Sequence, residues 1–236
     1  MVSTPPLQKL ASLQIVGATF LLAMLGFACL VLLSLSMALA WTPVPHEVRL
    51  VFDVASEANV WTWANVSVLS LAAYAYLYAA YVRWTSFIPG AIAWLLLGAV
   101  LLALSLDDLA GFHEKLGALG TAFGGGSGLT HFAWIIPGSV IALAVLGLCG
   151  VALLRIAGRP RRLLAIAAIS FFAGAIGLEA VGGSIYAAQG YNTLYVTTYH
   201  VEELMEAAGA TVFLCAGLAD LPLANRSLGD LFARSA

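Results

Sequence analysis

The amino-acid sequence predicts an all-α integral membrane protein, a polytopic bundle of about six transmembrane helices. Apolar residues make up 62% of the chain and charged residues only 9%. Mean hydropathy is +0.97, and long apolar segments recur along almost the whole length. Ordinary soluble domains are about 45–50% apolar and about 25% charged. Because a helix satisfies its own backbone hydrogen bonds in lipid, helices are the expected spanning elements.

Six apolar segments account for this fold class. Each is long enough to cross a hydrocarbon core of about 30 Å, which takes ~20 residues of helix. The predicted transmembrane helices cover approximately residues 12–40, 62–83, 89–109, 131–155, 163–187 and 195–218. No hydrophilic linker between them is long enough to separate two domains. Residues 1–236 are therefore expected to form a single transmembrane domain.

Basic residues give the predicted orientation. Of the 10 Lys and Arg residues, only Arg49 and Lys115 fall on the side of the six helices away from the termini. Cytoplasmic segments of membrane proteins are rich in Lys and Arg, so both termini are expected in the cytoplasm. The strongest anchor is the Arg-Pro-Arg-Arg turn at 159–162. A net charge of −2 and the lack of a basic stripe predict no nucleic-acid partner.

Two loops on the outer side have unusual compositions. Residues 41–61 mix charged with apolar side chains, which is typical either of an amphipathic segment at the membrane surface or of a solvated loop. Residues 117–128 are rich in glycine and form either a mobile lid or a flexible connection. Without a Lys-Ser or Lys-Thr ending, this second loop is not a phosphate-binding loop.

Ionisable residues gather at the outer ends of four predicted helices. At 1.5 Å per residue, Asp107 lies about 27 Å from the cytoplasmic start of its helix, and Glu179 lies about 25 Å from the start of its own. His131 begins its helix at the outer face, and His200 and Glu203 lie in the outer half of the last helix. Charged groups are expensive in or near a bilayer, so they tend to be kept there for pairing, metal binding or proton movement.

The spacing of these residues fits a shared site. His200 and Glu203 are three residues apart and are therefore neighbours on one face of a helix. Asp107 and Glu114 are seven residues apart and point in nearly the same direction if the helix continues through Gly111. Helix bundles that bind two metal ions combine single glutamates with Glu/His pairs three residues apart. In this chain the order within that pair is reversed, and the pair occurs once.

A divalent metal ion is the expected cofactor. Carboxylates packed together repel one another, and a bound cation is the simplest way to hold them close. Mixed imidazole and carboxylate ligands suit iron, zinc or manganese, and the cluster contains no cysteine for an iron–sulfur or thiolate zinc site. The predicted metal ligands are Asp107, His113, Glu114, Glu179, His200 and Glu203. The predicted auxiliary ligands, outer partners or proton carriers are Asp108, His131, Glu202 and Glu206.

Each candidate also has a purely structural interpretation. Asp107 and Asp108 could cap or end their helix at the aqueous interface, and His113 could be an ordinary loop residue. His131 could be a plain interfacial histidine. Glu202 points to a different side of its helix and is expected to face water or a partner subunit.

Three acidic segments carry a family resemblance. They are Leu-Asp-Asp-Leu-Ala-Gly-Phe-His-Glu at 106–114, Gly-Leu-Glu-Ala-Val-Gly-Gly at 177–183 and Glu-Glu-Leu-Met-Glu-Ala-Ala-Gly at 202–209. Together they resemble a set of uncharacterised prokaryotic polytopic membrane proteins with a Leu-Asp-Glu-type motif followed by His-Glu, and a late Glu-Glu-x-x-Glu helix. Asp108 stands where that family usually has Glu. The resemblance covers about residues 90–218 and implies one shared site in the inner membrane of a bacterial or archaeal cell, with no assigned activity.

Three functions remain open from the sequence. The first is a metal-dependent enzyme that acts on a lipid-soluble substrate, by dimetal oxidation or by zinc hydrolysis, with no catalytic residue assigned. The second is a proton or cation transporter lined by Glu179, Glu203 and Glu206, although the acidic residues thin out toward the cytoplasmic half. The third is an accessory subunit of a larger membrane complex. Expected partners are membrane lipids, the lipid-soluble substrate and further copies of the chain.

Overall fold

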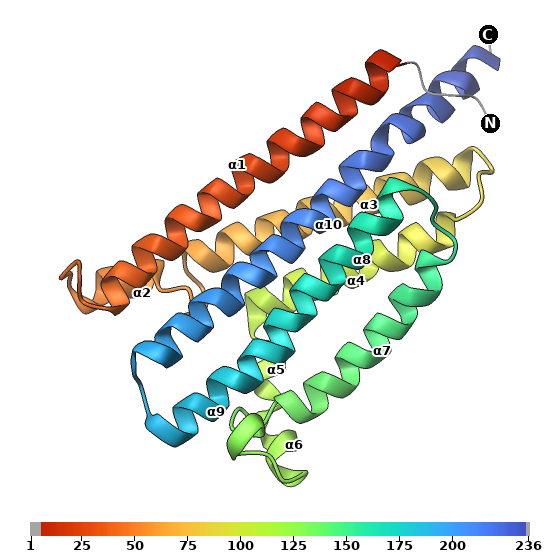
Figure 1. Cartoon of the computed structure of the whole chain (residues 1–236). Coiled ribbons are helices and arrows are strands. Elements are labelled where there is room, and N and C mark those ends of the chain that lie inside the picture. The colour runs from red at the N-terminus through yellow and green to blue at the C-terminus, as the bar shows by residue number, and fades with distance from the viewer. Residues whose placement is uncertain (1–5, 235–236) are drawn as a thin grey trace.

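The computed structural model describes the backbone of residues 6–234 and the side chains of residues 13–220. Helices make up 82% of the structure, and no strand occurs in the described backbone. The predicted all-α fold class is therefore confirmed. The long helices pack side by side as an elongated bundle and run in alternate directions (Figure 1).

The bundle contains both long and short helices. The long elements are α1 (Pro6–Ala38), α3 (Val60–Thr85), α4 (Ala91–Ala110), α7 (Ile135–Leu153), α8 (Arg159–Phe172), α9 (Glu179–Gln189) and α10 (Thr193–Arg234). The π-helix η2 (Ala173–Leu178) joins α8 to α9 without a break in direction. The short elements are α2 (His46–Phe52), α5 (Phe112–Lys115), α6 (Gly117–Ala122) and the 3₁₀ turn η1 (Gly128–Thr130).

Within the part of the chain that the structure describes, five helices are long and apolar enough to cross a membrane. They are α1 from Leu13, α3, α4, α7 and the continuous segment 159–189. The sixth predicted segment, 195–218, is helical as part of α10. It carries Glu202, Glu203 and Glu206, which make it too rich in charge to be recognised as a span from composition. Its place in the bundle is nevertheless central, because α10 packs against α1, α3, α8 and α9.

The two ends of the bundle differ in structure. One end carries α2, α5, α6 and the α9–α10 connection, and we call it the α2 end (Figure 1). The opposite end carries the α3–α4 and α7–α8 turns. The predicted outer loop 41–61 contains the helix α2, and the glycine-rich loop 117–128 begins with the helix α6. Both loops are therefore partly helical.

An apolar core fills the half of the bundle away from the α2 end. Its buried members include Leu69 of α3, Leu101 of α4, Leu164 of α8 and Leu214 of α10. Gly209 lets α8 and α10 approach closely, because a Cβ there would lie 2.7 Å from the backbone nitrogen of Phe171. Small residues at such contacts are typical of helix pairs in membranes.

One buried ion pair crosses this half of the bundle. Arg83 of α3 donates two hydrogen bonds to Asp220 of α10, at 2.5 and 2.7 Å. The same guanidinium lies over the ring of Trp94, 4.9 Å from its centroid. Bidentate pairs of this kind are the strongest polar contacts between side chains, so the pair fixes α10 against α3.

Candidate metal centre

The abrupt turn at Gly111, where α4 ends, brings Asp107 and His113 together. Gly111 adopts a left-handed conformation with φ +57°, and its N–H donates to the carbonyl of Asp107 at 2.7 Å. The chain then turns into α5. The helix therefore does not continue through Gly111, so the condition under which Asp107 and Glu114 would share one helical direction is not met. Asp107 acts instead as a cap for α5, because its Oδ1 accepts from the backbone N–H of His113 at 2.9 Å.

Asp107 also fixes the imidazole of His113. Its Oδ2 lies 3.0 Å from Nδ1 of His113, so this nitrogen donates and Nε2 remains free to bind a ligand. The ring of Trp134 packs edge-on against the imidazole, with centroids 4.6 Å apart. A carboxylate that orients a histidine in this way is the usual outer partner of a metal-binding histidine.

Glu57 lies in the loop between α2 and α3. It supplies a carboxylate that was not among the predicted metal ligands. The side chain of Asn59 anchors the loop, since it donates to the carbonyl of Asp53 at 2.6 Å. It also accepts from the N–H of Thr62 at 3.1 Å and so caps the start of α3. The Glu57 carboxylate lies directly over Gly111, where a Cβ would be 2.6 Å from its Oε2.

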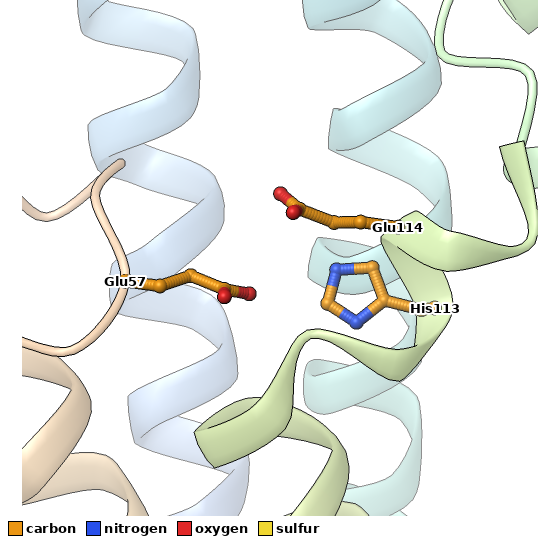
Figure 2. A group of neighbouring side chains, drawn as sticks. All are labelled: Glu57, His113 and Glu114. Atoms are coloured by element: carbon orange, nitrogen blue, oxygen red, sulfur yellow. The ribbon is translucent and has the colours of Figure 1, made fainter.

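Glu57, His113 and Glu114 form a group that could hold a metal ion. One ligand atom from each lies within 4.8 Å of the others. Figure 2 shows both carboxylates directed toward the same ring nitrogen of His113, while the other ring nitrogen points away from them. Glu57 and Glu114 are exposed and His113 is half-buried. We call these three residues the mouth site, because they open to the surface at the α2 end.

The mouth site is electrically negative. Burial raises the pKa of Glu57, and the nearby Glu114 and Asp107 raise it further against the opposing effect of His113 and Lys115. Burial alone would lower the pKa of His113, but the hydrogen bond to Asp107 and the charges of Asp107, Glu114 and Glu179 raise it overall. Both shifts have the direction expected where negative charge gathers, and such a site attracts cations.

A second group of carboxylates lies deeper, between α3, α4, α9 and α10. We call its members the deep carboxylates, and they are Asp108, Glu179, Glu202, Glu203 and Glu206. Asp108 accepts from Nδ2 of Asn65 at 3.2 Å, and Glu203 accepts from the indole N–H of Trp61 at 2.6 Å. Glu206 interacts electrostatically with Glu203, Asp108 and Glu179. The acidic residues of three sequence-distant helices therefore lie near enough to influence one another electrostatically.

The π-helix η2 helps to position this deep group. A Cβ at Gly174 would lie 2.9 Å from the carbonyl oxygen of Glu202 and 3.0 Å from Cγ of Glu206. Only glycine lets the two backbones come this close. The π-helix ends immediately before Glu179, whose carboxyl group faces that of Glu202 at hydrogen-bonding range. Single π turns inside α-helices are frequent at functional sites.

Three of the predicted site residues lie in surroundings that differ from the prediction. His200 is 2% exposed, and its Nδ1 donates to the carbonyl of Val196 at 2.7 Å while its Nε2 accepts from Ser34 Oγ at 2.9 Å. His131 packs against Phe132 and Tyr186 with centroids 5.2 and 5.5 Å away, outside both carboxylate groups. Glu202 was expected to face water or a partner subunit. That expectation is wrong, because Glu202 is only 5% exposed within the chain.

His200 supports the mouth site indirectly. Ser34 Oγ, which donates to His200, also accepts from the N–H of Val54 at 3.2 Å. Val54 is 2% exposed and belongs to the loop that carries Glu57. His200 therefore anchors this loop through Ser34, and we do not include it among the proposed metal ligands.

Gly111→Ala is expected to weaken metal binding and to destabilise the fold. The new Cβ would push the Glu57 carboxylate away from His113, and the left-handed conformation costs a non-glycine residue about 1–2 kcal/mol. Gly117→Ala is a matched control, since nothing lies within 4 Å of a Cβ built there. Metal titration and thermal unfolding of both variants check this expectation. Equal metal affinity and stability in the two variants would contradict it.

Fold and site together define an all-helical protein with membrane-length helices and a His/Glu group suited to a metal ion. The chain belongs to the family described as a domain of unknown function (DUF8692), whose family model matches residues 18–221. The resemblance to an uncharacterised family is confirmed at this level. No curated protein matches the chain, and no solved structure matches it either.

Proposed function

We propose that this protein is a metal-dependent membrane enzyme whose divalent ion binds at Glu57, His113 and Glu114. The observation that carries the proposal is the convergence of three ligand atoms within 4.8 Å of one another. Asp107 supports it, because it holds Nδ1 of His113 at 3.0 Å and leaves Nε2 to the ion. Metal-binding histidines usually have such a carboxylate partner.

The ligand set suits zinc, manganese or iron, because imidazole and carboxylate are the donors these ions share. Three protein ligands with an open fourth position are typical of catalytic zinc sites, and structural sites are closed. Two of the three ligands are exposed, which favours an open position reached by water. A bound ion of this kind activates water for hydrolysis. Hydrolysis therefore has more support than oxidation by a dimetal centre, for which the mouth site alone offers too few ligands.

The membrane setting suggests the substrate class. Asp107 lies in the last turn of α4, a helix long and apolar enough to span a bilayer, so the mouth site lies where a membrane meets water. The distribution of Lys and Arg in the sequence favours the outer side of the membrane for this end. A lipid or another lipid-soluble molecule is the substrate that reaches such a site most directly.

Transport of a proton or cation has weaker support. The deep carboxylates lead inward from the mouth site, but residues one turn further along α3 and α10 belong to the apolar core. Leu69 follows Asn65 by one turn, and Ala210 follows Glu206 by one turn. A pathway through the membrane needs polar groups at both depths, and this core separates the deep carboxylates from the Arg83–Asp220 pair.

Elemental analysis of protein purified in detergent without chelators tests the proposal. We expect the wild type to carry zinc, manganese or iron, and Glu57→Gln to lose about one equivalent per chain, because metal binding needs the charged ligand. Glu47→Gln is the matched control, since Glu47 is an exposed acid on α2 at the same end of the bundle. A wild type without these metals, or equal losses in the two variants, would refute the mouth site.

A further inference from the structure

A groove lies between α4 and α7 at the end of the bundle opposite the mouth site, where the α3–α4 and α7–α8 turns lie (Figure 1). Its volume is about 740 Å³. Most of the side chains that line it are apolar, and they include Ile92 and Leu96 of α4 and Leu148 and Val151 of α7. Arg155, just beyond the end of α7, lines it as well. We call this feature the α4–α7 groove.

The position of the groove along the helices places it where a membrane meets water. Both α4 and α7 are long and apolar enough to span a bilayer, and the groove lies at one end of each. Ile92 and Val151 are 62% and 63% exposed, so lipid chains can reach them. Trp84 and Phe87, which also line the groove, are 67% and 93% exposed, and large aromatic side chains favour the membrane interface. The groove therefore runs from the interface into the hydrocarbon region.

Arg155 gives the groove a positive charge that the protein does not balance. Among the described side chains, no carboxylate forms an ion pair with Arg155, whereas the other arginine that lines the groove, Arg83, is paired with Asp220. The start of α4 lies beside Arg155, since a Cβ at Gly90 would be 3.4 Å from the carbonyl oxygen of Arg155. No side chain caps this helix, so its partial positive charge adds to that of the arginine.

We propose that the α4–α7 groove binds one acidic phospholipid, whose phosphate pairs with Arg155 and whose acyl chain lies along Ile92 and Val151. Basic pockets between transmembrane helices on the cytoplasmic side bind anionic head groups, and the distribution of Lys and Arg favours that side for this end. The arginines of the segment 159–162 are exposed at the same end and attract acidic lipids toward it.

Charge and shape together favour this occupant over others. A zwitterionic phospholipid has the same chains, but the cation in its head group offsets the phosphate, so it gains less from Arg155. A free phosphate ion would leave the apolar walls of the groove uncovered. A second copy of the chain, packed by two-fold symmetry, would bring two unpaired Arg155 side chains toward each other.

Native mass spectrometry of the full-length protein in detergent tests the contact with the head group. The delipidated protein is titrated with phosphatidylglycerol, or with phosphatidylcholine that has the same acyl chains. We expect the wild type to bind one phosphatidylglycerol and to prefer it by about fivefold or more. Arg155→Gln is expected to lose this preference. Arg161→Gln is the matched control and is expected to keep it, because Arg161 is an exposed arginine at the same end that does not line the groove.

Filling the groove tests the position of the acyl chain. Val151→Trp places a large ring where the chain is expected to lie, and it should weaken the binding of both lipids about tenfold, the effect of about two buried methylene groups. Val140→Trp is the matched control, since Val140 is 66% exposed on the same helix and does not line the groove. It is expected to bind both lipids as the wild type does. Thermal unfolding verifies that each variant is folded.

The contrary outcomes each overturn a definite part of the proposal. Equal affinity of the wild type for the two lipids, or equal losses in Arg155→Gln and Arg161→Gln, would overturn the head-group contact. Equal binding by Val151→Trp and Val140→Trp would overturn the position of the chain. A wild type that binds neither lipid, and that forms a dimer which Val151→Trp dissociates, would assign the groove to a second copy of the chain.

Discussion

Arg83→Ala is expected to lower the free energy of unfolding by about 3–5 kcal/mol, because removing one member of a buried ion pair leaves the other charge without a partner. The side chains of Arg83 and Asp220 are only 12% and 3% exposed, so water replaces little of the lost contact. The substitution also removes the cation–π contact with Trp94. The pair joins α3 to α10, and its loss loosens the helix that carries most of the deep carboxylates.

The double variant Arg83→Met/Asp220→Leu distinguishes the lost charge from lost packing. Replacing both members of a buried pair by apolar residues of similar volume is often neutral or stabilising. Arg155→Ala is the control for removing a charge near the same end of the bundle, since Arg155 is exposed, and it is expected to change stability by ~0.5 kcal/mol or less. Reversible unfolding in detergent micelles measures all three variants. An Arg83→Ala variant as stable as Arg155→Ala would contradict the structural role of the pair.

His113→Ala is expected to reduce the metal affinity of the mouth site more than ~100-fold. Loss of an outer partner of a metal ligand typically costs about 10–100-fold in affinity, and His113 is the ligand itself. The substitution leaves Glu57 and Glu114, two exposed carboxylates that bind a divalent ion weakly when no nitrogen donor accompanies them. It also frees the side chain of Asp107, which then has only the backbone N–H of residue 113 to accept.

Competition with a chelating zinc dye measures this affinity. His46→Ala is the matched control, because His46 is an exposed histidine on α2 at the same end of the bundle. We expect the control to keep the affinity of the wild type. If His113→Ala and His46→Ala bind zinc equally well, then His113 is not a ligand.

The fold was predictable because apolar segments long enough to cross a bilayer are typical of transmembrane helices. Each predicted segment is helical over most of its length, although the segment 163–187 is divided among α8, η2 and α9, and α10 continues well beyond residue 218. The position of Asp108, Glu179 and Glu206 toward one end of the bundle could be foreseen from their depth along three helices. The break at Gly111 could not, since glycine inside an apolar pattern fits either a continuous helix or the left-handed turn that ends α4.

The direction of individual side chains was harder to predict. His200 and Glu203 are three residues apart, which separates them by about 60° around a helix. Because α10 is surrounded by other helices, this angle is enough to direct His200 to Ser34 of α1 and Glu203 to Trp61 of α3. Spacing alone shows which residues share a face, and the neighbouring helices determine which of them share a site.

Glu57 and Asn65 were missed for different reasons. Glu57 lies in a loop, and its proximity to His113 depends on the anchoring of that loop by Asn59 and on the absence of a side chain at Gly111. No local pattern encodes such a contact. Asn65 carries no charge, so it did not stand out in an apolar helix. A polar residue inside a predicted span is itself a signal of a buried partner, and that signal could have identified it.

The X-ray absorption spectrum of zinc-loaded protein tests the metal centre most directly. With about one equivalent of zinc bound, we predict a first shell of nitrogen and oxygen donors at about 2.0–2.2 Å, with the outer scattering of a single imidazole. The outer imidazole signal should disappear in His113→Ala. A sulfur shell at about 2.3 Å, two or more imidazoles, or a spectrum unchanged by His113→Ala would contradict a site built from Glu57, His113 and Glu114.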